Sequence, residues 1–271
     1  MPTTWQTMSG PGPATALGMI EDLSQAVIGV DFDGTLSPVT PHPRDARLDP
    51  AAADELRRLA EAGATVGIIT GRGVESLLDV AATELAEIPH LVIEGMYGAE
   101  RWSDGVLHTI PTPECIHRLR LEVPAVVRAT VSDPDVWIED KRLSLVVHTR
   151  MATNAEALQA SLTVPLADVA ARHDMELHLG KEVLELRLRG IDKATALERL
   201  AGETCRAIVY AGDDIGDLPA FASVRRWRER TGLPGITIGV VSDASSPIAG
   251  RADWEVRDTA GLTGMLRTLG R

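Results

Sequence analysis

The strongest constraint on the fold of this chain is the alternation of short apolar runs with segments of helical periodicity. The runs AVIGVD, from Ala26 to Asp31, and ATVGIIT, from Ala64 to Thr70, have the length and composition of buried strands. Between them, the segment from Pro50 to Gly63 has helical spacing, with Pro at its start and Gly at its end. Strands joined by helices in this way form parallel sheets that are covered on both faces.

The same alternation returns near the end of the chain. A helix, two strands and a final helix are expected over Lys193–Leu200, Ala207–Asp213, Gly235–Val241 and Thr259–Leu269. We therefore predict an α/β fold, with a Rossmann-like parallel-sheet core and helices on both faces.

The segment between the two halves has a different pattern. Residues 111–189 indicate a helix, a hairpin within VWIEDKRLSLVVHT, a second helix over Asn154–His173, and strands at ELHLG and VLELRL. This is the pattern of a smaller, open-faced α/β unit. We predict a core domain of residues 1–108 and 190–271, with residues 1–20 as a loose leader, and an inserted α/β cap domain of residues 109–189.

The composition narrows the classes of partner. A net charge of −12 argues against nucleic acid, because affinity for nucleic acid comes largely from Lys and Arg. The start of the chain lacks the basic region of a signal peptide, and no apolar run approaches the ~20 residues of a membrane span, which predicts a cytoplasmic protein without a membrane partner. Cys115 and Cys205 have no metal or redox spacing and are expected to be buried, reduced thiols. The oligomeric state stays open, and a monomer is compatible with the sequence.

Two carboxylates follow the first predicted strand. In DFDGTLSP, Asp31 and Asp33 lie at the carboxyl end of the strand, and Gly34 follows where the backbone must turn. Ligands of open α/β sheets bind outside the carboxyl ends of the strands, so both side chains are expected to face the ligand. Taken alone, Asp33-Gly34 is more simply a turn and Asp31 a helix cap.

A second acidic pair, Asp213 and Asp214 of the segment GDD, ends another apolar strand. Because parallel strand ends converge, Asp213 is expected close to Asp31. Like charges at that distance require a cation or a proton, and oxygen ligands suit Mg²⁺. The pattern predicts Mg²⁺ as the cofactor.

Two further segments supply groups for an anion. Thr70 and Gly71 place a hydroxyl and a backbone amide at a helix start, and Lys193 places a positive charge at another. Each signal alone is as well explained by a helix cap or a solvated lysine. Together with the carboxylates they predict a site for a small phosphorylated ligand.

These segments, in order Asp31-Phe32-Asp33-Gly34-Thr35, Thr70, Lys193 and Gly212-Asp213-Asp214, resemble the four motifs of the haloacid dehalogenase-like phosphatases. The resemblance implies that Asp31 is the nucleophile that forms an aspartyl-phosphate, and that Asp33 is the general acid and base. It implies that Thr70 and Lys193 hold the phosphoryl oxygens, and we assign Gly71 and Arg72 to the substrate. The implied metal site consists of Asp31, the carbonyl of Asp33, Asp213 and Asp214, where Asp214 and Asp217 either orient waters or serve as turn and cap residues.

More narrowly, DFDGTLSP, TGR, EGMYGAE (94–100), EDKRLSLVVHTR (139–150), GKEVLELR (180–187) and GDDIGDLPAF (212–221) are similar to segments of the trehalose-6-phosphate phosphatases. This resemblance implies Mg²⁺-dependent hydrolysis of trehalose 6-phosphate. In the cap it implies a set of side chains that face the sugar, namely Glu139, Lys141, Arg150, Lys181 and Glu185. Each of these alone is equally an exposed polar residue on one face of a sheet.

The chain departs from the family pattern in three segments. Gly216, Leu218 and Pro219 replace a Thr and two acids of the usual fourth motif, so a thinner metal shell is expected, with Asp217 as an N-cap before an intact helix. Thr149 stands where an aromatic residue is common, and Met96-Tyr97 replace the usual residues before Gly98. The last two differences bear on the choice of sugar.

Three alternative functions stay open. One is hydrolysis of another sugar phosphate, of the sucrose phosphate or glycosyl-phosphoglycerate type. Another is a non-catalytic sugar-phosphate sensor, which the complete set of reactive groups disfavours. The third is a signalling receiver whose Asp accepts phosphate, which the inserted unit and the place of Asp31 after the first predicted strand disfavour.

Overall fold

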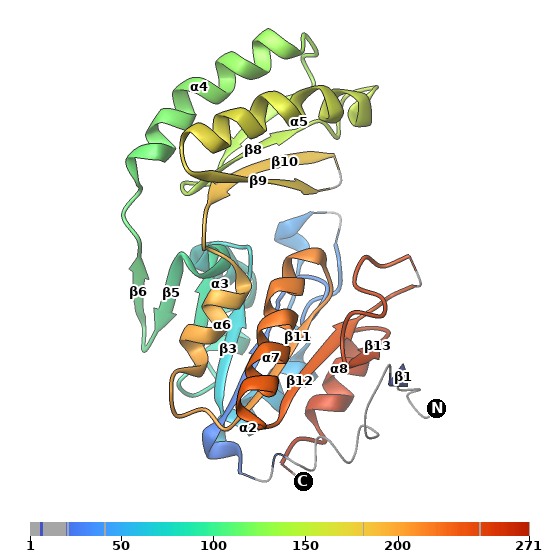
Figure 1. The fold of residues 1–271 in the computed structure, drawn as a ribbon. Coiled ribbons are helices and arrows are strands. Elements are labelled where there is room, and N and C mark those ends of the chain that lie inside the picture. Colours follow the sequence, from blue (N-terminus) through green and yellow to red (C-terminus); the bar gives the residue numbers. More distant parts are fainter. Residues whose placement is uncertain are drawn as a thin grey trace. The chain divides into compact units, whose positions relative to one another are not determined.

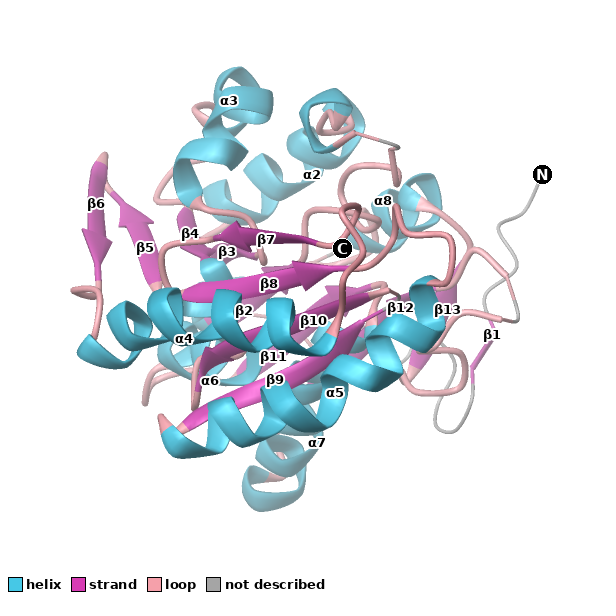
Figure 2. Cartoon of the chain, turned by 90° about the horizontal axis from the view of Figure 1, so that it is seen from above, coloured by secondary structure: helices cyan, strands magenta, loops and turns pink. Residues whose placement is uncertain are grey.

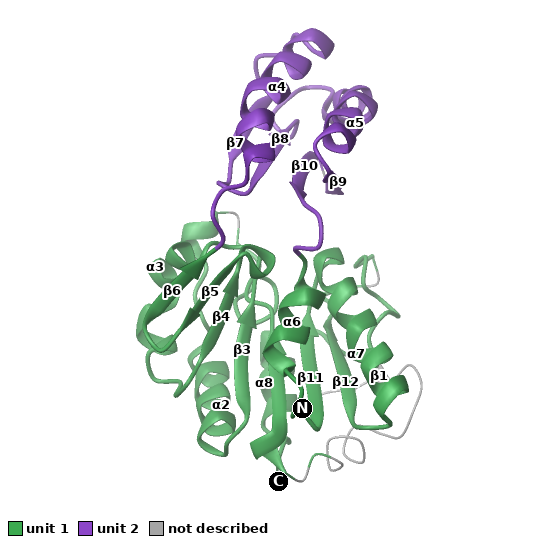
Figure 3. Cartoon of the chain, turned by 60° about the vertical axis from the view of Figure 1, so that its left-hand side comes forward, with its two compact units in different colours: residues 1–109, 192–271 green, residues 110–191 purple. Residues whose placement is uncertain are grey.

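The structure is a computed structural model of the 271-residue chain and describes residues 6–7, 20, 22–40, 42–180, 182–243 and 245–270. The chain forms two compact units (Figure 3). Unit 1 comprises Met1–Thr109 and Asp192–Arg271, and unit 2 comprises Ile110–Ile191.

Unit 1 is built on a nine-stranded sheet in the order β1-β13-β12-β11-β2-β3-β4-β5-β6. Its strands are β1 (Gln6–Thr7), β2 (Ala26–Val30), β3 (Thr65–Ile69), β4 (Val92–Gly95), β5 (Glu100–Ser103), β6 (Val106–Thr109), β11 (Ala207–Gly212), β12 (Gly235–Val240) and β13 (Trp254–Val256). The strands from β13 to β4 are parallel, whereas β1, β5 and β6 pair antiparallel at the two edges. The predicted α/β fold with a parallel core is confirmed.

Helices cover both faces of this sheet. The helices are α2 (Pro50–Glu61), α3 (Val74–Leu85), α6 (Lys193–Ala201), α7 (Leu218–Thr231) and α8 (Thr259–Leu266). Figure 1 shows α6 and α7 side by side on one face, where they pack with Ile208 and Tyr210 of β11, while Val209 and Ala211 pack in the core that α2, α3 and α8 share. Because successive strand residues point to opposite faces, a strand buried on both faces must be apolar throughout, which explains the continuous apolar runs.

Local capping sets where the helices that border the carboxyl edge begin. The side chain of Asp192 accepts a hydrogen bond from the backbone N–H of Thr195, so α6 begins at Lys193. Pro219 lies in the first turn of α7, where a missing N–H is tolerated. The helix is intact, as predicted from the sequence.

Unit 2 is an antiparallel sheet with helices on one face. Its elements are α4 (Glu114–Thr130), β7 (Trp137–Asp140), β8 (Ser144–His148), α5 (Ala155–Arg172), β9 (Met175–Gly180) and β10 (Val183–Leu188), with the strand order β7-β8-β10-β9. Figure 2 shows α4 and α5 lying along the strands, and alternate strand residues such as Leu145, Val147 and Leu184 pack under them. The intervening residues therefore lie on the opposite face of the sheet.

Two details differ from the sequence analysis. Gln6 and Thr7 of the predicted leader pair with β13, and Ile20 is buried, while the other residues of the leader lie outside the described part of the chain. Cys205 is buried, but Cys115 is only partly buried because it lies beside, not within, the apolar stripe that α4 turns to the sheet. Both cysteines are free thiols.

None of the helices in the described residues combines the length and apolar composition that crossing a membrane requires.

Candidate active site

The loop after β2 brings the DFDG and GDD segments against each other. The backbone N–H of Asp31 donates to the carbonyl of Ala211 on β11 (2.9 Å), and the Asp31 side chain is buried. Gly34 has φ of +79°, and a Cβ on this residue would collide with the carboxylate of Asp213. Only glycine combines this backbone conformation with so close an approach. The turn thus places Asp213 beside the loop that carries Asp31, as the sequence predicted.

Lys193 joins this cluster from the first residue of α6. Its side chain is buried, and its Nζ lies 3.0 Å from Oδ1 of Asp31 and 2.7 Å from Oδ1 of Asp217. Burial favours the neutral amine, but Asp217 and Asp31 raise the pKa of Lys193 well above its usual range. The ammonium therefore stays charged at neutral pH and holds the side chain of Asp31 in place.

Asp217 has a different environment from the one predicted. It precedes α7 but makes no capping hydrogen bond to that helix, and its side chain is fully buried. Its Oδ1 accepts from Lys193 and from the hydroxyl of Tyr210 (2.6 Å), and its Oδ2 accepts from the backbone N–H groups of Asp213 (2.9 Å) and Asp214 (3.0 Å). A carboxylate has about four lone-pair sites, and four donors occupy them. Asp217 thus organises the cluster, and little acceptor capacity remains for a metal.

Sequence reasoning missed Tyr210. Its ring is buried between the sheet and α7, where it packs edge-on against Phe221, and its hydroxyl reaches Asp217. The available signal was a tyrosine inside an otherwise aliphatic strand, since a buried tyrosine hydroxyl usually has a hydrogen-bond partner.

The acidic cluster has the composition of a cation site. Carboxylate oxygens of Asp31, Asp213 and Asp217 all lie within 4.8 Å of one another. Burial raises the pKa of Asp31 well above its usual range and that of Asp213 to about 7, and neighbouring carboxylates add to both shifts. Oxygen ligands with an unbalanced negative charge fit a hard divalent cation. With Asp217 saturated, Asp31 and Asp213 are the carboxylates with capacity for a metal.

Asp214 lies at the rim of this cluster. Its side chain is 59% exposed, accepts from the N–H of Gly216 (2.8 Å), and lies 4.0 Å from Nζ of Lys193. The hydrogen bond from Gly216 is that of a turn or cap residue, one of the two roles expected for Asp214. Its predicted place in the metal site stays a prediction.

Asp33 forms a two-bond ion pair with Arg72. Nε and Nη2 of Arg72 donate to the two carboxylate oxygens of Asp33, each at 2.6 Å. The side chain of Asp33 is 46% exposed, so it borders solvent, unlike Asp31. Both groups were predicted site residues, but their pairing was not. For acid and base chemistry Asp33 has to exchange these bonds for one to the reacting oxygen.

Residues at the end of β4 and just after it hold the TGR turn that follows β3. The N–H of Thr70 donates to the carbonyl of Glu94, and the N–H of Tyr97 donates to the carbonyl of Thr70 (both 2.9 Å). A Cβ on Gly71 would lie 2.8 Å from the hydroxyl of Tyr97. Met96 and Tyr97 both have positive φ, 48° and 59°, so this departure from the family pattern builds the turn that supports Thr70 and Gly71.

On unit 2, the predicted sugar-facing residues lie mainly on the sheet face opposite α4 and α5. The strand register places Glu139, Val146, Glu185 and His178 in one row across the four strands. Nζ of Lys141 lies 4.0 Å from Oε2 of Glu139, and the hydroxyl of Ser144 donates to Glu185 (2.7 Å). The expected convergence of Glu139 and Lys141 is present.

An aromatic pair beside Glu139 was not anticipated. The rings of Trp137 and His148 stack with centroids 3.9 Å apart and an interplanar angle of 4°, and Nε2 of His148 lies 2.9 Å from Oε2 of Glu139. Trp137 remains 46% exposed. Its position two residues before Glu139 on a strand was the available signal, because residues at that spacing share a face.

Two predicted cap residues remain, Arg150 and Lys181. Arg150 is exposed in the turn after β8, and Lys181 lies outside the described residues. Thr149, at the second departure from the family pattern, is buried, and both its N–H and its hydroxyl donate to the carbonyl of Glu182. Thr149 therefore supports the backbone here.

Comparisons with known proteins show which family the chain matches. Residues 29–259 match the family model described as trehalose-phosphatase. The trehalose-phosphate phosphatase of Mycobacterium tuberculosis (strain H37Rv) is 31% identical over 222 residues, which are 78% of this chain and 55% of that protein. The trehalose-6-phosphate phosphatase of Escherichia coli K12 is 29% identical over 232 residues, 83% of this chain and 79% of that protein. The chain spans about half the length of the mycobacterial relatives.

Solved structures show the same fold. The C-terminal domain of the Candida albicans trehalose-6-phosphate phosphatase aligns with a TM-score of 0.77 and 18% identity, covering 100% of this chain and 99% of that one. The Aspergillus fumigatus trehalose-6-phosphate phosphatase aligns with a TM-score of 0.72 and 22% identity, covering 96% and 98%.

Proposed function

The chain belongs to the trehalose-phosphatase family, and from this premise we propose that it hydrolyses trehalose 6-phosphate to trehalose and phosphate with Mg²⁺. The observation that carries the proposal is the buried Lys193–Asp31 pair beside Asp213, at the carboxyl edge of a parallel sheet. An oriented carboxylate beside fixed positive charge is the arrangement that nucleophilic attack on a phosphate ester requires.

In the first step, a carboxylate oxygen of Asp31 forms a bond to phosphorus. The bond between phosphorus and the sugar oxygen breaks, and that oxygen takes a proton from Asp33. The products of this step are free sugar and a phosphorylated Asp31. Covalent catalysis of this kind divides one difficult step into two easier ones.

In the second step, Asp33 acts as a carboxylate base. It takes a proton from water, the water oxygen forms a bond to phosphorus, and the bond from phosphorus to the Asp31 oxygen breaks. This releases phosphate and restores Asp31, with Asp33 protonated for the next turnover. Arg72 has to release Asp33 for both steps, and the phosphate is the anion to which Arg72 can then donate.

Fixed donors at the same edge stabilise the transferring group. We assign Lys193 and Thr70 to the phosphoryl oxygens, which Lys193 would neutralise and Thr70 would hydrogen-bond. In support, both side chains are buried, Lys193 is the first residue of α6 and Thr70 directly follows β3. Asp31, Asp213 and the Asp33 carbonyl would hold Mg²⁺, with Asp214 acting through waters. The bound ion adds positive charge where the phosphoryl oxygens lie.

Recognition of the sugar is assigned to the face of unit 2 that carries Glu139, Lys141 and Glu185. Carboxylates accept hydrogen bonds from sugar hydroxyls, and the exposed ring of Trp137 offers an apolar surface for a pyranose ring. Binding energy from the non-reacting sugar orients the phosphate.

The test is phosphate release from a panel of phosphate esters, with Mg²⁺ and after chelation. The panel contains trehalose 6-phosphate, sucrose 6-phosphate, a glycosyl-phosphoglycerate and p-nitrophenyl phosphate. The proposal requires the highest kcat/KM on trehalose 6-phosphate and no turnover without metal. A higher kcat/KM on another sugar phosphate would reject trehalose 6-phosphate as the substrate but would leave the proposed mechanism standing. No turnover of any ester by the Mg²⁺-loaded protein would reject both.

A further inference from the structure

A cavity of about 180 Å³ lies between α6 and α7, away from the groups described above. Its lining comprises Leu197, Glu198, Ala201, Gly202, Ile208, Ser223, Arg226, Trp227 and Arg230. The lining residues of α6 lie toward the end of that helix and Ile208 lies near the start of β11, whereas Lys193 is the first residue of α6 and Asp213 follows the end of β11. The cavity is therefore at the edge of the sheet opposite the catalytic groups.

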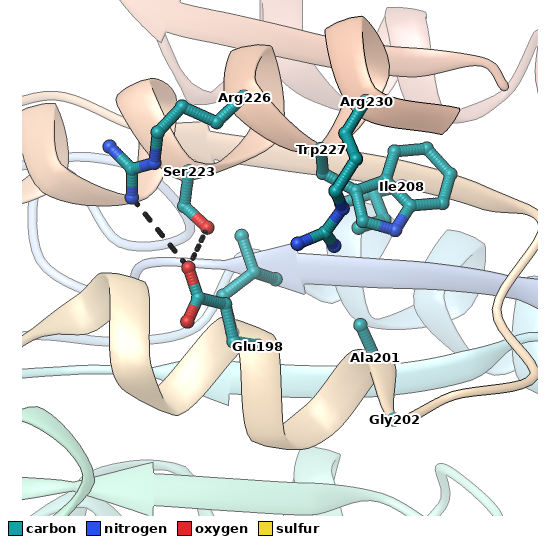
Figure 4. Close-up of a pocket in the computed structure, with 9 residues that line it drawn as sticks. Glu198, Ala201, Gly202, Ile208, Ser223, Arg226, Trp227 and Arg230 are labelled. Carbon is teal, nitrogen blue, oxygen red and sulfur yellow. Dashed lines mark hydrogen bonds and ion pairs between the residues drawn. The ribbon is translucent and has the colours of Figure 1, made fainter. Parts of the chain in front are cut away.

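The cavity combines an apolar floor with a flat wall. Leu197, Ala201 and Ile208 are buried and belong to the core on this face of the sheet, and the partly buried Trp227 packs against the same core. A side chain at Gly202 would meet nothing within 4 Å, so this part of the lining borders open space. Figure 4 shows the indole of Trp227 on the side of α7, above Ala201 of α6.

The charged residues of the lining, Glu198, Arg226 and Arg230, sum to one positive charge. Oε1 of Glu198 accepts from the hydroxyl of Ser223 (2.6 Å) and lies 3.6 Å from Nη2 of Arg226. These contacts account for Glu198 and Arg226. Figure 4 shows the guanidinium of Arg230, an exposed residue of α7, between Glu198 and Trp227, with no hydrogen bond or ion pair to the other residues of the lining. The lining thus carries one net positive charge on a chain whose net charge is −12.

The size of the cavity limits the occupant. A cavity of roughly 150 Å³ accepts one benzene ring, whereas pockets for drug-sized ligands begin at roughly 300 Å³. A disaccharide phosphate would extend well beyond this space. A single aromatic ring that carries one carboxylate matches both the volume of the cavity and the one net positive charge of its lining.

We propose that this cavity is a binding site for a small aromatic monocarboxylate. The ring lies on the apolar floor against Trp227, and the carboxylate takes the paired N–H groups of Arg230. This site is separate from the phosphatase site, so the two proposals stand or fall independently.

The probe is benzoate, titrated into the full chain with Mg²⁺ present and followed by calorimetry. Benzyl alcohol supplies the ring without the charge, and acetate supplies the charge without the ring. We expect saturable one-to-one binding of benzoate, and weaker binding of both partial probes. Arg230→Gln should weaken benzoate binding by about tenfold or more, the effect of removing a hydrogen bond to a charged group.

The matched control is Arg225→Gln, because Arg225 lies on the same helix and does not line the cavity. This control should bind benzoate as the parent does. Trp227→Leu supplies a second test of the wall and should also weaken binding, and thermal unfolding checks that each variant is folded. The proposal is overturned if benzoate shows no saturable binding, if Arg230→Gln binds it as tightly as the parent, or if acetate binds as well as benzoate.

Discussion

The ammonium of Lys193 lies 2.7 Å from a carboxylate oxygen of Asp217, and neither side chain reaches solvent to more than 3% of its surface. Asp217 also accepts from the Tyr210 hydroxyl and from two backbone N–H groups of the GDD turn. One buried carboxylate therefore links the start of α6, the middle of β11 and the loop that carries Asp213.

Replacing Asp217 with Asn should destabilise the protein strongly. An amide presents one acceptor oxygen and an NH₂ group, so it cannot accept all four hydrogen bonds. Its NH₂ group would face donors of the protein that then have no acceptor. Breaking a buried charge pair costs about 3 kcal/mol or more of unfolding free energy, which denaturant titration of the metal-free protein measures. Asp214→Asn is the control, since Asn caps a turn as well as Asp does, and a change within about 0.5 kcal/mol is expected. Equal losses in the two variants would contradict this role of Asp217.

Activity should disappear with a chelator and return with Mg²⁺. The carboxylate of Asp213 lies near Asp31 and accepts from Thr35, so lone pairs remain for a metal ion. In contrast, protein donors occupy all the acceptor sites of Asp217. Asp213→Ala should therefore raise the Mg²⁺ concentration for half-maximal activity strongly, with kcat measured at saturating Mg²⁺. Asp217→Ala is compared only if thermal unfolding shows that it is folded, because Asp217 also holds the loop that carries Asp213. Turnover that survives thorough chelation, or an unchanged Mg²⁺ requirement in Asp213→Ala, would show that the metal ligands are assigned incorrectly.

Asp31→Asn should abolish turnover and leave the fold intact. The amide is a poor nucleophile, and Lys193 keeps Asp217 as its partner. Because burial raises the pKa of Asp31 well above its usual range, the charged form is costly in the metal-free protein. The thermal midpoint without metal should therefore match or exceed that of the parent at about pH 8. Phosphate release near the parent rate would exclude the covalent mechanism.

Without metal, the acidic cluster should make the protein less stable as the pH rises. Burial raises the pKa of Asp213 from 3.8 to about 7, so between these values the folded state holds a proton that the unfolded chain has released. This contribution is complete below 3.8 and is lost as the pH rises through about 7, and the raised pKa values of Asp31 and Asp214 have the same sign. The difference between the thermal midpoints at about pH 5 and pH 8 measures how steeply stability falls with pH. Both added Mg²⁺ and the substitution Asp213→Asn should reduce this difference. An unchanged difference in Asp213→Asn would assign the effect to other groups.

The sheet face of unit 2 should matter for the sugar and not for the chemistry. Glu139→Ala should lower kcat/KM on trehalose 6-phosphate by roughly tenfold or more, the effect of one hydrogen bond to a charged group. Trp137→Ala should also lower it, because the apolar surface for the sugar ring is lost. On p-nitrophenyl phosphate, which has no sugar, the change should be small. Glu156→Ala, in the first turn of α5, is the control and should affect neither substrate. Equal losses on both substrates would mean that the face supports folding and does not recognise the sugar.

Much of the fold followed from local sequence. Buried parallel strands must be apolar on both faces, and helices between them carry recognisable caps, so AVIGVD, ATVGIIT and the segments around Lys193 could be assigned without a structure. The approach of Asp213 to Asp31 followed from one rule, that parallel strands end at the same edge of the sheet.

The sequence by itself thus determined which groups meet at the carboxyl edge. Strands that alternate with helices are parallel and end at the same edge, and local caps mark where the helices start. Only the tertiary structure decided the partners of these groups. Asp217 turns inward to Lys193 and Tyr210, Asp33 pairs with Arg72, and Trp137 stacks on His148. Each of these contacts joins residues from different segments of the chain, so its formation depends on how the elements pack, which no local pattern of residues records. For the buried Asp217 and Lys193 the assembled core also makes pairing necessary, because an unpaired buried charge is costly.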